Sequence, residues 1–185
     1  MVFKKVSAPI FVIEIESTNI KTVELGLDKY LVSQNEAGNI TLFKISNTFE
    51  LVKQTLKLGD NSLASKKFDA MKISDGKAIL VAVDSNGQFY VYEIQNISNS
   101  PKIIKTNLQN IDCICISYYK KEMIVWYKKK KKIGALIIET GKIQESLLSS
   151  RENENILRIL NVFSNENSEE CEFWFHTFGE VNIFK

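Results

Sequence analysis

Cysteine and histidine have the most versatile chemistry of the side chains in this sequence, and there are few of them. Cys113 and Cys115 form a C-x-C pair, a spacing that puts both thiols on one face of a strand. A metal site would need further ligands, and the chain offers only Cys171 and His176. We therefore interpret the cysteines as buried or half-buried free thiols, with a metal or redox site as the alternative. His176 lies in the run FWFHTF, which favours a packed strand histidine over a catalytic one.

A run of five lysines, Lys128–Lys132, is the strongest charge feature of the chain. It lies where two predicted strands turn over, so one interpretation is an exposed, solvated loop. The other is an RNA-contact patch, because each lysine–phosphate contact releases about one counterion and makes binding depend on salt. Aromatic side chains nearby could stack on bases, although their alternation with Ile and Val also fits core packing. These aromatic residues are Tyr118, Tyr119, Trp126 and Tyr127.

A second basic feature is the pair Lys66 and Lys67 in the segment ASKKF. The pair precedes a predicted strand, and loops at such positions commonly bind partners, with ordinary solvated lysines as the alternative. Asp75, Asp84 and Asp112 fall at turns or strand starts, where an aspartate side chain bonds to nearby backbone groups. The sequence has no Gly-rich phosphate loop, and we expect no catalytic, cofactor-binding or metal-binding residues.

The elements that position these side chains repeat along the chain. The segment GQFYVYEI (87–94) has copies at 38–45 (GNITLFKI) and 179–185 (GEVNIFK). The three glycines are 49 and 92 residues apart, and half of 92 predicts another copy near residue 133. The sequence there reads IGALIIE, which keeps the apolar positions and the final charge. A period of this length is typical of β-propeller blades.

Each copy belongs to a longer unit, and four units are predicted, over residues 16–58, 67–108, 110–148 and 155–185. Their apolar runs are rich in Val, Ile, Phe, Tyr and Thr and alternate with Gly, Asn, Asp and Ser, as in short antiparallel strands. The run ILRILNVF (156–163) would also fit a helix by propensity. A single four-stranded unit cannot bury both of its apolar faces, so we expect the units to stack side by side.

We expect one all-β domain over residues 1–185, a β-propeller of about four four-stranded antiparallel blades. The fourth unit lacks its outermost strand. The run PIFVIEI (9–15) could supply that strand and close the ring. The alternative is an incomplete ring, taken from a longer array or completed by another chain. A net charge of +2 and 44% hydrophobic residues are ordinary for a soluble globular protein.

The units resemble the WD-repeat class of β-propellers, although none contains the Gly-His or Trp-Asp dipeptides. Within that class, residues 20–95 resemble the middle blades of the Wuho-like, non-catalytic subunits of tRNA (guanine-N7)-methyltransferase. The resemblance rests on GNITLFKI and on ASKKFDAMKISDGKAILVAVDSNGQFYVYEI, and residues 110–185 resemble the last blades of the same family. Asp84 stands where the family has a lysine, and blades that the family places between these two regions are missing here.

The resemblance implies a scaffold that binds the catalytic subunit of the methyltransferase and supports tRNA modification, without catalytic residues of its own. Lys66 and Lys67 match a basic position of the family, so they are the implied partner-binding residues. The alternatives are a direct RNA-binding module that uses Lys128–Lys132 and a propeller adaptor in another complex. We expect no membrane partner, no small-molecule substrate and no cofactor. Three cysteines and no secretion-signal pattern favour an intracellular protein, in the nucleus or the cytoplasm.

Overall fold

The structure is a computed structural model that describes residues 19–45, 51–55, 67–96, 100–119, 122–130, 132–148, 158–164, 171–176 and 181–184. These residues form strands and one short 3-10 helix, and no α-helix is found among them, which confirms the all-β prediction. The elements are β1 (Asn19–Leu25), β2 (Asp28–Gln34), β3 (Ile40–Ile45), β4 (Leu51–Thr55), β5 (Lys67–Ser74), β6 (Lys77–Val83), β7 (Phe89–Glu93), η1 (Ile94–Asn96), β8 (Lys102–Ile104), β9 (Cys113–Tyr119), β10 (Glu122–Lys129), β11 (Lys132–Ile137), β12 (Ile143–Leu148), β13 (Arg158–Ser164), β14 (Cys171–His176) and β15 (Val181–Phe184).

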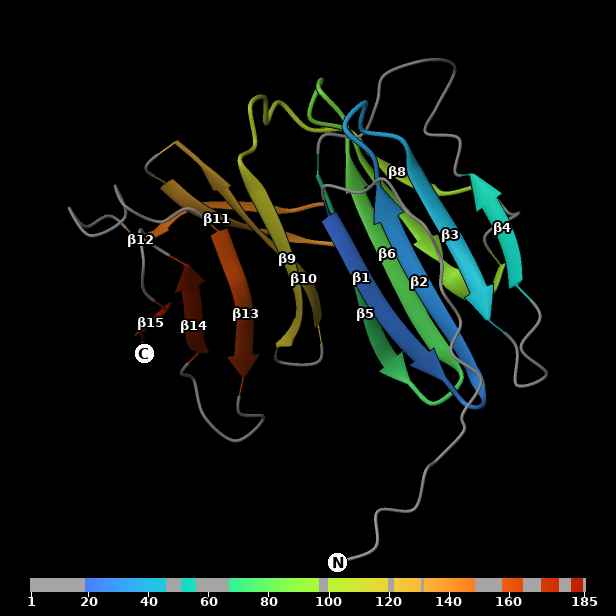
Figure 1. The fold of residues 1–185 in the computed structure, drawn as a ribbon. Coiled ribbons are helices and arrows are strands. Elements are labelled where there is room, and N and C mark those ends of the chain that lie inside the picture. The colour runs from blue at the N-terminus through green and yellow to red at the C-terminus, as the bar shows by residue number, and fades with distance from the viewer. Residues whose placement is uncertain are drawn as a thin grey trace, which may run out of the picture.

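The strands pair with their neighbours in chain order and make four antiparallel sheets (Figure 1). The first sheet contains β1 to β4, the second β5 to β8, the third β9 to β12 and the fourth β13 to β15. The third strand of each sheet (β3, β7, β11 and β15) begins close to a position that the sequence repeat marks, so the repeat corresponds to the sheets. The fourth sheet has three strands among the described residues.

The turn that precedes the third strand is built in the same way in the first two sheets. The carbonyl of Asn35 accepts from the amide of Gly38, and its side-chain oxygen accepts from the amide four residues on. Asp84 makes the equivalent two bonds, with Gly87 in the place of Gly38. Both glycines have a positive φ, 82° and 79°, which a residue with a Cβ rarely adopts. This turn explains why the two copies share a glycine.

The third sheet replaces that turn with a tighter hairpin, which explains the loss of the glycine there. Lys129 and Lys132 are direct partners in the register of β10 and β11. Lys130 takes the positive φ, at 55°, so the turn needs no glycine before β11. The sequence repeat therefore changes where the backbone geometry of the turn changes.

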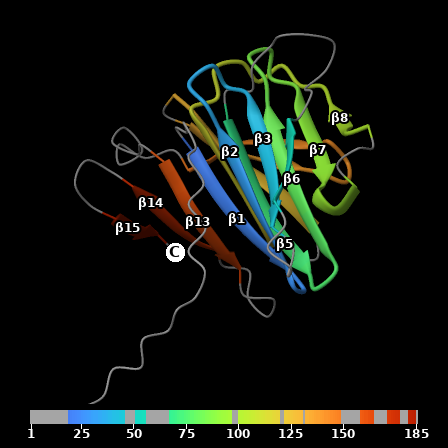
Figure 2. The same cartoon turned by 45° about the vertical axis from the view of Figure 1, so that its right-hand side comes forward.

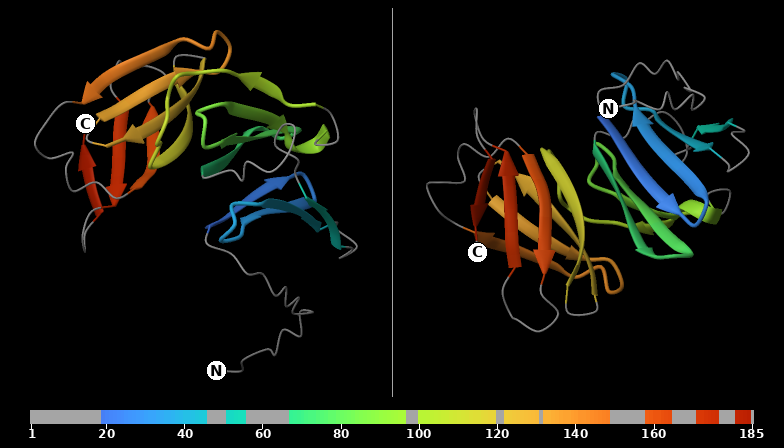
Figure 3. Two further views of the ribbon diagram at one scale, coloured as in Figure 1. Left: turned by 90° about the horizontal axis from the view of Figure 1, so that it is seen from above. Right: turned by 60° about the horizontal axis from the view of Figure 1, so that its bottom comes forward.

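Both faces of the second sheet are buried, one against the first sheet and the other against the third (Figures 2 and 3). Side chains alternate between the two faces of a strand, and every apolar residue of β6 is at most 2% exposed. This confirms that the units stack because no single sheet covers its own faces. The two sets from β6 are Ala78, Leu80 and Ala82 toward the first sheet, and Ile79, Val81 and Val83 toward the third.

The third sheet meets the fourth through their first strands, β9 and β13. The amide of Ile159 donates to the Cys113 sulfur at 3.4 Å, and both residues are buried. Trp126, on the same face, donates from Nε1 to the buried Ser117 hydroxyl at 2.7 Å. The burial of these groups indicates a packed junction rather than a loose contact.

A buried aspartate joins three of the sheets at their first strands. Asp69, in β5, is 4% exposed. Its Oδ2 accepts from the Ile116 amide of β9 at 2.8 Å, and its Oδ1 lies 2.8 Å from the Lys21 ammonium of β1. A buried carboxylate is stable only when it is paired and hydrogen-bonded, and both conditions are met by residues of neighbouring sheets. Asp69 therefore fixes the order β1, β5, β9 at the centre of the stack.

Three details differ from the sequence prediction or lie beyond it. The second unit was predicted to extend to residue 108, but its last strand, β8, ends at Ile104, and two residues further on the Thr106 hydroxyl donates to the Gly87 carbonyl. The ambiguous run 156–163 forms a strand, β13. The predicted closing strand, 9–15, lies outside the described residues. None of the helices in the described ranges is long and apolar enough to cross a membrane.

Candidate partner-binding rim

The first strands of the four sheets all run in the same direction, so each end of the stack collects equivalent turns. Bonds between neighbouring first strands support this common direction. Asp69 of β5 bonds to Lys21 of β1 and Ile116 of β9, and Ile159 of β13 bonds to Cys113 of β9, and in each bond the two residues lie at similar positions along their strands. We call the end where β1, β5, β9 and β13 begin the upper rim, and the end where they finish the lower rim (Figure 1). Lys67 begins β5, and the β10–β11 turn lies beside the start of β9, so both predicted basic sites belong to the upper rim.

The lysine run forms the turn between β10 and β11, as predicted. Lys130 and Lys132 are exposed and Lys129 is half-buried. Lys131 lies outside the described residues. Among the described ion pairs, none involves Lys129, Lys130 or Lys132. The outer part of the run thus places positive charge in solvent at the upper rim.

Lys128 differs from the rest of the run, because the structure buries most of it. Its side chain is 12% exposed and its Nζ lies 2.9 Å from Asp112 Oδ2. The same oxygen accepts from the Lys130 amide at 3.0 Å, so Asp112 organises the turn and also neutralises the first lysine. The interpretation of five exposed lysines is wrong for Lys128. A carboxylate 16 residues away in sequence makes the burial possible.

Lys67 lies on the same rim as the lysine turn, although the two are far apart in sequence. Burial raises the pKa of the Cys113 thiol, and the ammonium groups of Lys128 and Lys67 both act on it in the opposite direction. Both charges are therefore near the start of β9. Lys66 lies outside the described residues. Sequence analysis missed Lys105, an exposed residue directly after β8, whose upper end is set by the pairing of Ile104 with Phe89.

The carboxylates of Asp84 and Asp112 on the upper rim already have structural partners. Asp84 is 5% exposed and accepts from the amides of Asn86 and Gln88 at 2.8 and 2.9 Å. Its other oxygen accepts from the Tyr90 hydroxyl at 3.1 Å. Asp84 therefore serves as a turn former, as predicted, and Asp112 is held by Lys128. Neither carboxylate balances the exposed lysines.

The lower rim also carries lysines, and four of the described ones have acidic neighbours. Its ion pairs are short and lie on the surface. The hydrogen bond from Lys72 lowers the pKa of Asp75, and the hydrogen bond to Asp28 raises the pKa of Lys44. The pairs are Lys29–Glu24 at 3.1 Å, Lys44–Asp28 at 2.7 Å, Lys72–Asp75 at 2.6 Å and Lys77–Glu93 at 2.9 Å.

The aromatic residues near the lysine run do not form a base-stacking surface with it. Trp126 and Tyr127 are 5% and 2% exposed and belong to the core. Tyr118 is 43% exposed, but its register partner is Met123, so it lies toward the lower rim. The side chain of Tyr119 lies outside the described residues. The alternation of Trp126 and Tyr127 with apolar residues predicted that they pack in the core, and the structure places them there.

The cysteines of β9 are buried free thiols, as predicted. Burial raises the pKa of both thiols, and that of Cys115 is further raised by the nearby Asp69 carboxylate. Thiols held in the protonated form are poor nucleophiles and poor metal ligands. Within the described ranges, no three of the His, Cys, Asp and Glu side chains converge as metal ligands would. His176 ends β14, and its side chain and that of Cys171 lie outside the described residues.

Comparison with known proteins gives no relative: no family model matches the chain, and neither does any curated protein. The description of this protein therefore rests on its fold and on the charges of its two rims. It is an all-β protein of stacked antiparallel sheets, with a basic rim at one end and a charge-paired rim at the other.

Proposed function

We propose that this protein is a non-catalytic scaffold that binds a partner at its upper rim. One observation carries the proposal: Lys129, Lys130 and Lys132 lie together at one rim, and none of the ion pairs of the described residues includes them. A rigid stack of sheets holds these charges in place, so little ordering is needed on binding. Buried polar groups such as Asp69 and Asp84 have structural partners, which fits a supporting rather than a chemical role.

The partner that fits this rim best is a protein with an acidic surface, because complementary charge speeds encounter and selects the partner. The WD-repeat resemblance suggests the catalytic subunit of tRNA (guanine-N7)-methyltransferase. Lys66 and Lys67 would then lie at the contact, and tRNA would be bound through the complex, in the nucleus or the cytoplasm. An adaptor in another complex would use the same rim.

Direct RNA binding is a second candidate, favoured by the exposed lysines at the β10–β11 turn. Lys129, Lys130 and Lys132 could contact consecutive phosphates without reading sequence. Lys128 would not take part, because Asp112 already neutralises it. The buried positions of Trp126 and Tyr127 leave this candidate without its stacking surface, so the scaffold remains the better-supported proposal.

Two charge-matched variants test the proposal. The upper-rim variant replaces Lys129, Lys130 and Lys132 with serine, and the lower-rim variant replaces Lys29, Lys72 and Lys77, so both lose three charges. Affinity capture from cell extract, read by mass spectrometry, should recover a methyltransferase subunit or another acidic protein with the wild type. The lower-rim variant should retain it, and the upper-rim variant should lose at least about tenfold, the size of a few charged contacts.

A single-stranded RNA oligonucleotide separates the two candidates. If the rim binds RNA, the slope of log affinity against log salt should fall by about 2 in the upper-rim variant, since three contacts are removed. Equal capture by both variants would contradict the scaffold proposal, and an unchanged salt slope would contradict the RNA candidate.

We also propose that the sheets are blades of a WD-like propeller that residues 9–15 complete by pairing with β15. β15 corresponds to β3, β7 and β11, each of which has a further strand on its outer edge. An unpaired edge invites pairing, and PIFVIEI has the alternation of a strand. Val12→Pro should lower Tm by about 5–10 °C, because proline removes a ladder donor. Val2→Pro is the matched control, and equal melting of the two variants would rule the closure out.

A further inference from the structure

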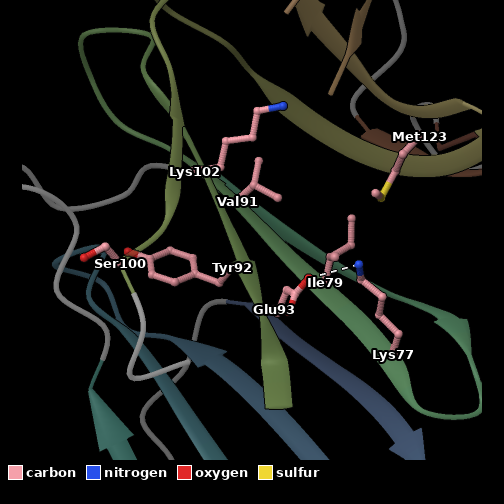
Figure 4. Close-up of a pocket in the computed structure, with 8 residues that line it drawn as sticks. All are labelled: Lys77, Ile79, Val91, Tyr92, Glu93, Ser100, Lys102 and Met123. Atoms are coloured by element: carbon pink, nitrogen blue, oxygen red, sulfur yellow. Dashed lines mark ion pairs between the residues drawn. The ribbon is translucent and has the colours of Figure 1, made fainter. Parts of the chain in front are cut away.

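A sheet inside the stack turns one face toward the next sheet along the chain and the other toward the previous one. We call these its forward and rear faces. At the junction of the second and third sheets, Ile79 and Val91 of the forward face stand opposite Met123 of β10 (Figure 4). The rear face of the second sheet packs on the forward face of the first. Among the described sheets, the rear face of the first and the forward face of the fourth remain, at the two ends of an open arc (Figure 3).

The rear face of the first sheet has the kinds of residue with which the second sheet packs against its predecessor. Ser33 and Ala82 are small, and each lies five residues before the turn glycine of its sheet. Phe43 and Tyr92 are aromatic, and each lies five residues after that glycine. Ala82 and Tyr92 belong to the core that the first two sheets share. Ser33 and Phe43 are already buried, and the open part of the face lies over β1.

The first strand is the part of a sheet through which junctions are made. Neighbouring sheets meet through β1 and β5, β5 and β9, and β9 and β13. On the rear face of β1, Ile20 is the register partner of Ser33. Its counterpart on β5 is Phe68, the register partner of Ala82. Ile20 is 48% exposed and Phe68 only 2%, so a large apolar side chain stands in solvent at a position that a junction buries elsewhere.

The forward face of the fourth sheet carries Trp174 at such a position. Its register partner is Ile183, the fourth residue after Gly179. Trp174 is half-buried, and its Nε1 donates to Glu172 Oε1 at 2.7 Å. The residues at the same place in the other three sheets face the next sheet and are at most 5% exposed: Val32, Val81 and Ile124. The two end faces are therefore of the two kinds that meet at every junction inside the stack.

We propose that two copies of this chain join into one closed ring of eight sheets. The forward face of the fourth sheet of each copy packs against the rear face of the first sheet of the other, so Trp174 and Ile20 lie at both junctions. A contact between two different faces closes into a ring when the rotation completes a circle. Eight blades lie within the range of propellers, and closure buries both end faces of each copy.

This inference rests on the proposed propeller and deepens it, because it says which sheets complete the ring. Residues 9–15 precede the first sheet of one copy, so the strand β15 with which they are proposed to pair belongs to the other copy. The rim lysines take no part in the junctions. The oligomeric state and partner capture are therefore separate readouts.

The molar mass of the full-length chain, measured by light scattering at micromolar concentration, should be twice 21.2 kDa. Ile20→Glu should raise the dissociation constant of the dimer at least about tenfold, because each junction would then bury an unpaired carboxylate. Ile103→Glu is the matched control. Ile103 is 47% exposed on β8, at the outer edge of the second sheet and away from both end faces, so its substitution should leave the dimer intact.

A second variant, Trp174→Lys, changes the other end face and should also dissociate the dimer. Mixing it with Ile20→Glu should restore dimers, because one junction of a mixed pair then has neither substitution and the other joins opposite charges. A dimer built from two rear faces would show no such rescue, which would contradict the proposal.

Three further outcomes would overturn the dimer: a wild type with the mass of one chain, a mass that grows beyond two copies, or equal effects of Ile20→Glu and Ile103→Glu. The mass of one chain would mean that the ring closes on itself or stays open. If Ile20→Glu does not fold, the mass of the wild type and the effect of Trp174→Lys still decide. A single-copy protein that captures its partner would remove the dimer and keep the scaffold, and a dimer that captures none would do the reverse.

Discussion

The two rims of this protein use the same kinds of residue in opposite ways. On the lower rim, acidic side chains lie on the surface and pair with lysines, as in Lys72–Asp75 and Lys77–Glu93. On the upper rim, the buried Asp84 accepts from backbone amides and a tyrosine, and Asp112, although 44% exposed, binds Lys128 and the amide of Lys130. Among the described lysines of the upper rim, Lys130 and Lys132 face solvent.

This difference teaches that charge on the surface depends on how the turns are built. The chain has a net charge of only +2, and it still has a basic rim. The reason is that Asp84 and Asp112 of this rim bind groups of their own turns, so they do not pair with Lys129, Lys130 or Lys132. Paired surface ions contribute little to stability, whereas buried carboxylates that accept several hydrogen bonds contribute much more. The comparison therefore predicts that equivalent substitutions have large effects on the upper rim and small ones on the lower rim.

The largest contrast is expected between two glycines with positive φ, Gly87 and Gly26. A Cβ on Gly87 would meet the backbone carbonyl of Leu108, whereas a Cβ on Gly26 would meet nothing within 4 Å. Gly87→Ala should destabilise the fold by about 4 kcal/mol, because strained φ and backbone overlap add, and Gly26→Ala by only about 1 kcal/mol. Urea denaturation measures both. Equal losses would show that the upper turns are no more tightly packed than the lower ones.

A smaller contrast is expected between Asp84→Ala and Asp75→Ala. Removing the Asp84 carboxylate leaves two amides and the Tyr90 hydroxyl without their acceptor, at a cost of about 3 kcal/mol. Asp75 is fully exposed and bonds only to Lys72 among the described residues, so its loss should leave Tm unchanged. Thermal melting of both variants checks this. A stable Asp84→Ala variant would remove the distinction between structural and surface carboxylates.

The smallest effect concerns Tyr90 and Tyr92, which lie on β7 toward the upper and the lower rim. Burial raises the pKa of both hydroxyls, with a further contribution from Asp84 for Tyr90, and that of Tyr92 reaches about 12. Since the folded pKa lies above the unfolded one, this stability is complete below pH 10 and is lost as pH rises toward 12.

The amount that Tyr92 contributes is on the order of 2–3 kcal/mol, from two units of pKa. Tyr92→Phe should therefore lose less stability than the wild type between pH 9 and pH 11.5, as measured by urea denaturation at the two values. Parallel losses in the two proteins would contradict the assigned burial of Tyr92.

Much of the fold could be predicted from the sequence, because alternation and turn residues are local signals. The spacing of the repeated segment located β3, β7, β11 and β15, and the turn residues Asp84 and Gly87 marked a hairpin that the structure contains. The end of β8 could not be predicted, because it depends on a bond between Thr106 and Gly87 across the turn.

The candidate site was less predictable, since it depends on contacts between distant residues. Nothing in the sequence distinguishes one lysine of the run from another. Only the fold shows that Lys128 is mostly buried and that its ammonium pairs with Asp112. Lys67 and the lysine turn lie on the same rim because β5 and β9, the first strands of neighbouring sheets, run side by side, which no spacing indicates. Asp69 was missed for the same reason: it reads as an ordinary polar position of a strand, and its partners lie on two other sheets.

The position of Asp69 has a consequence for synthesis of the chain on the ribosome. Its carboxylate emerges after Lys21 but 47 residues before Ile116, the amide that completes its bonding. While the first two sheets are the only part outside the exit tunnel, Asp69 has Lys21 as its ion-pair partner but lacks the Ile116 amide. The bonding of Asp69 is therefore complete only after the third sheet has been translated.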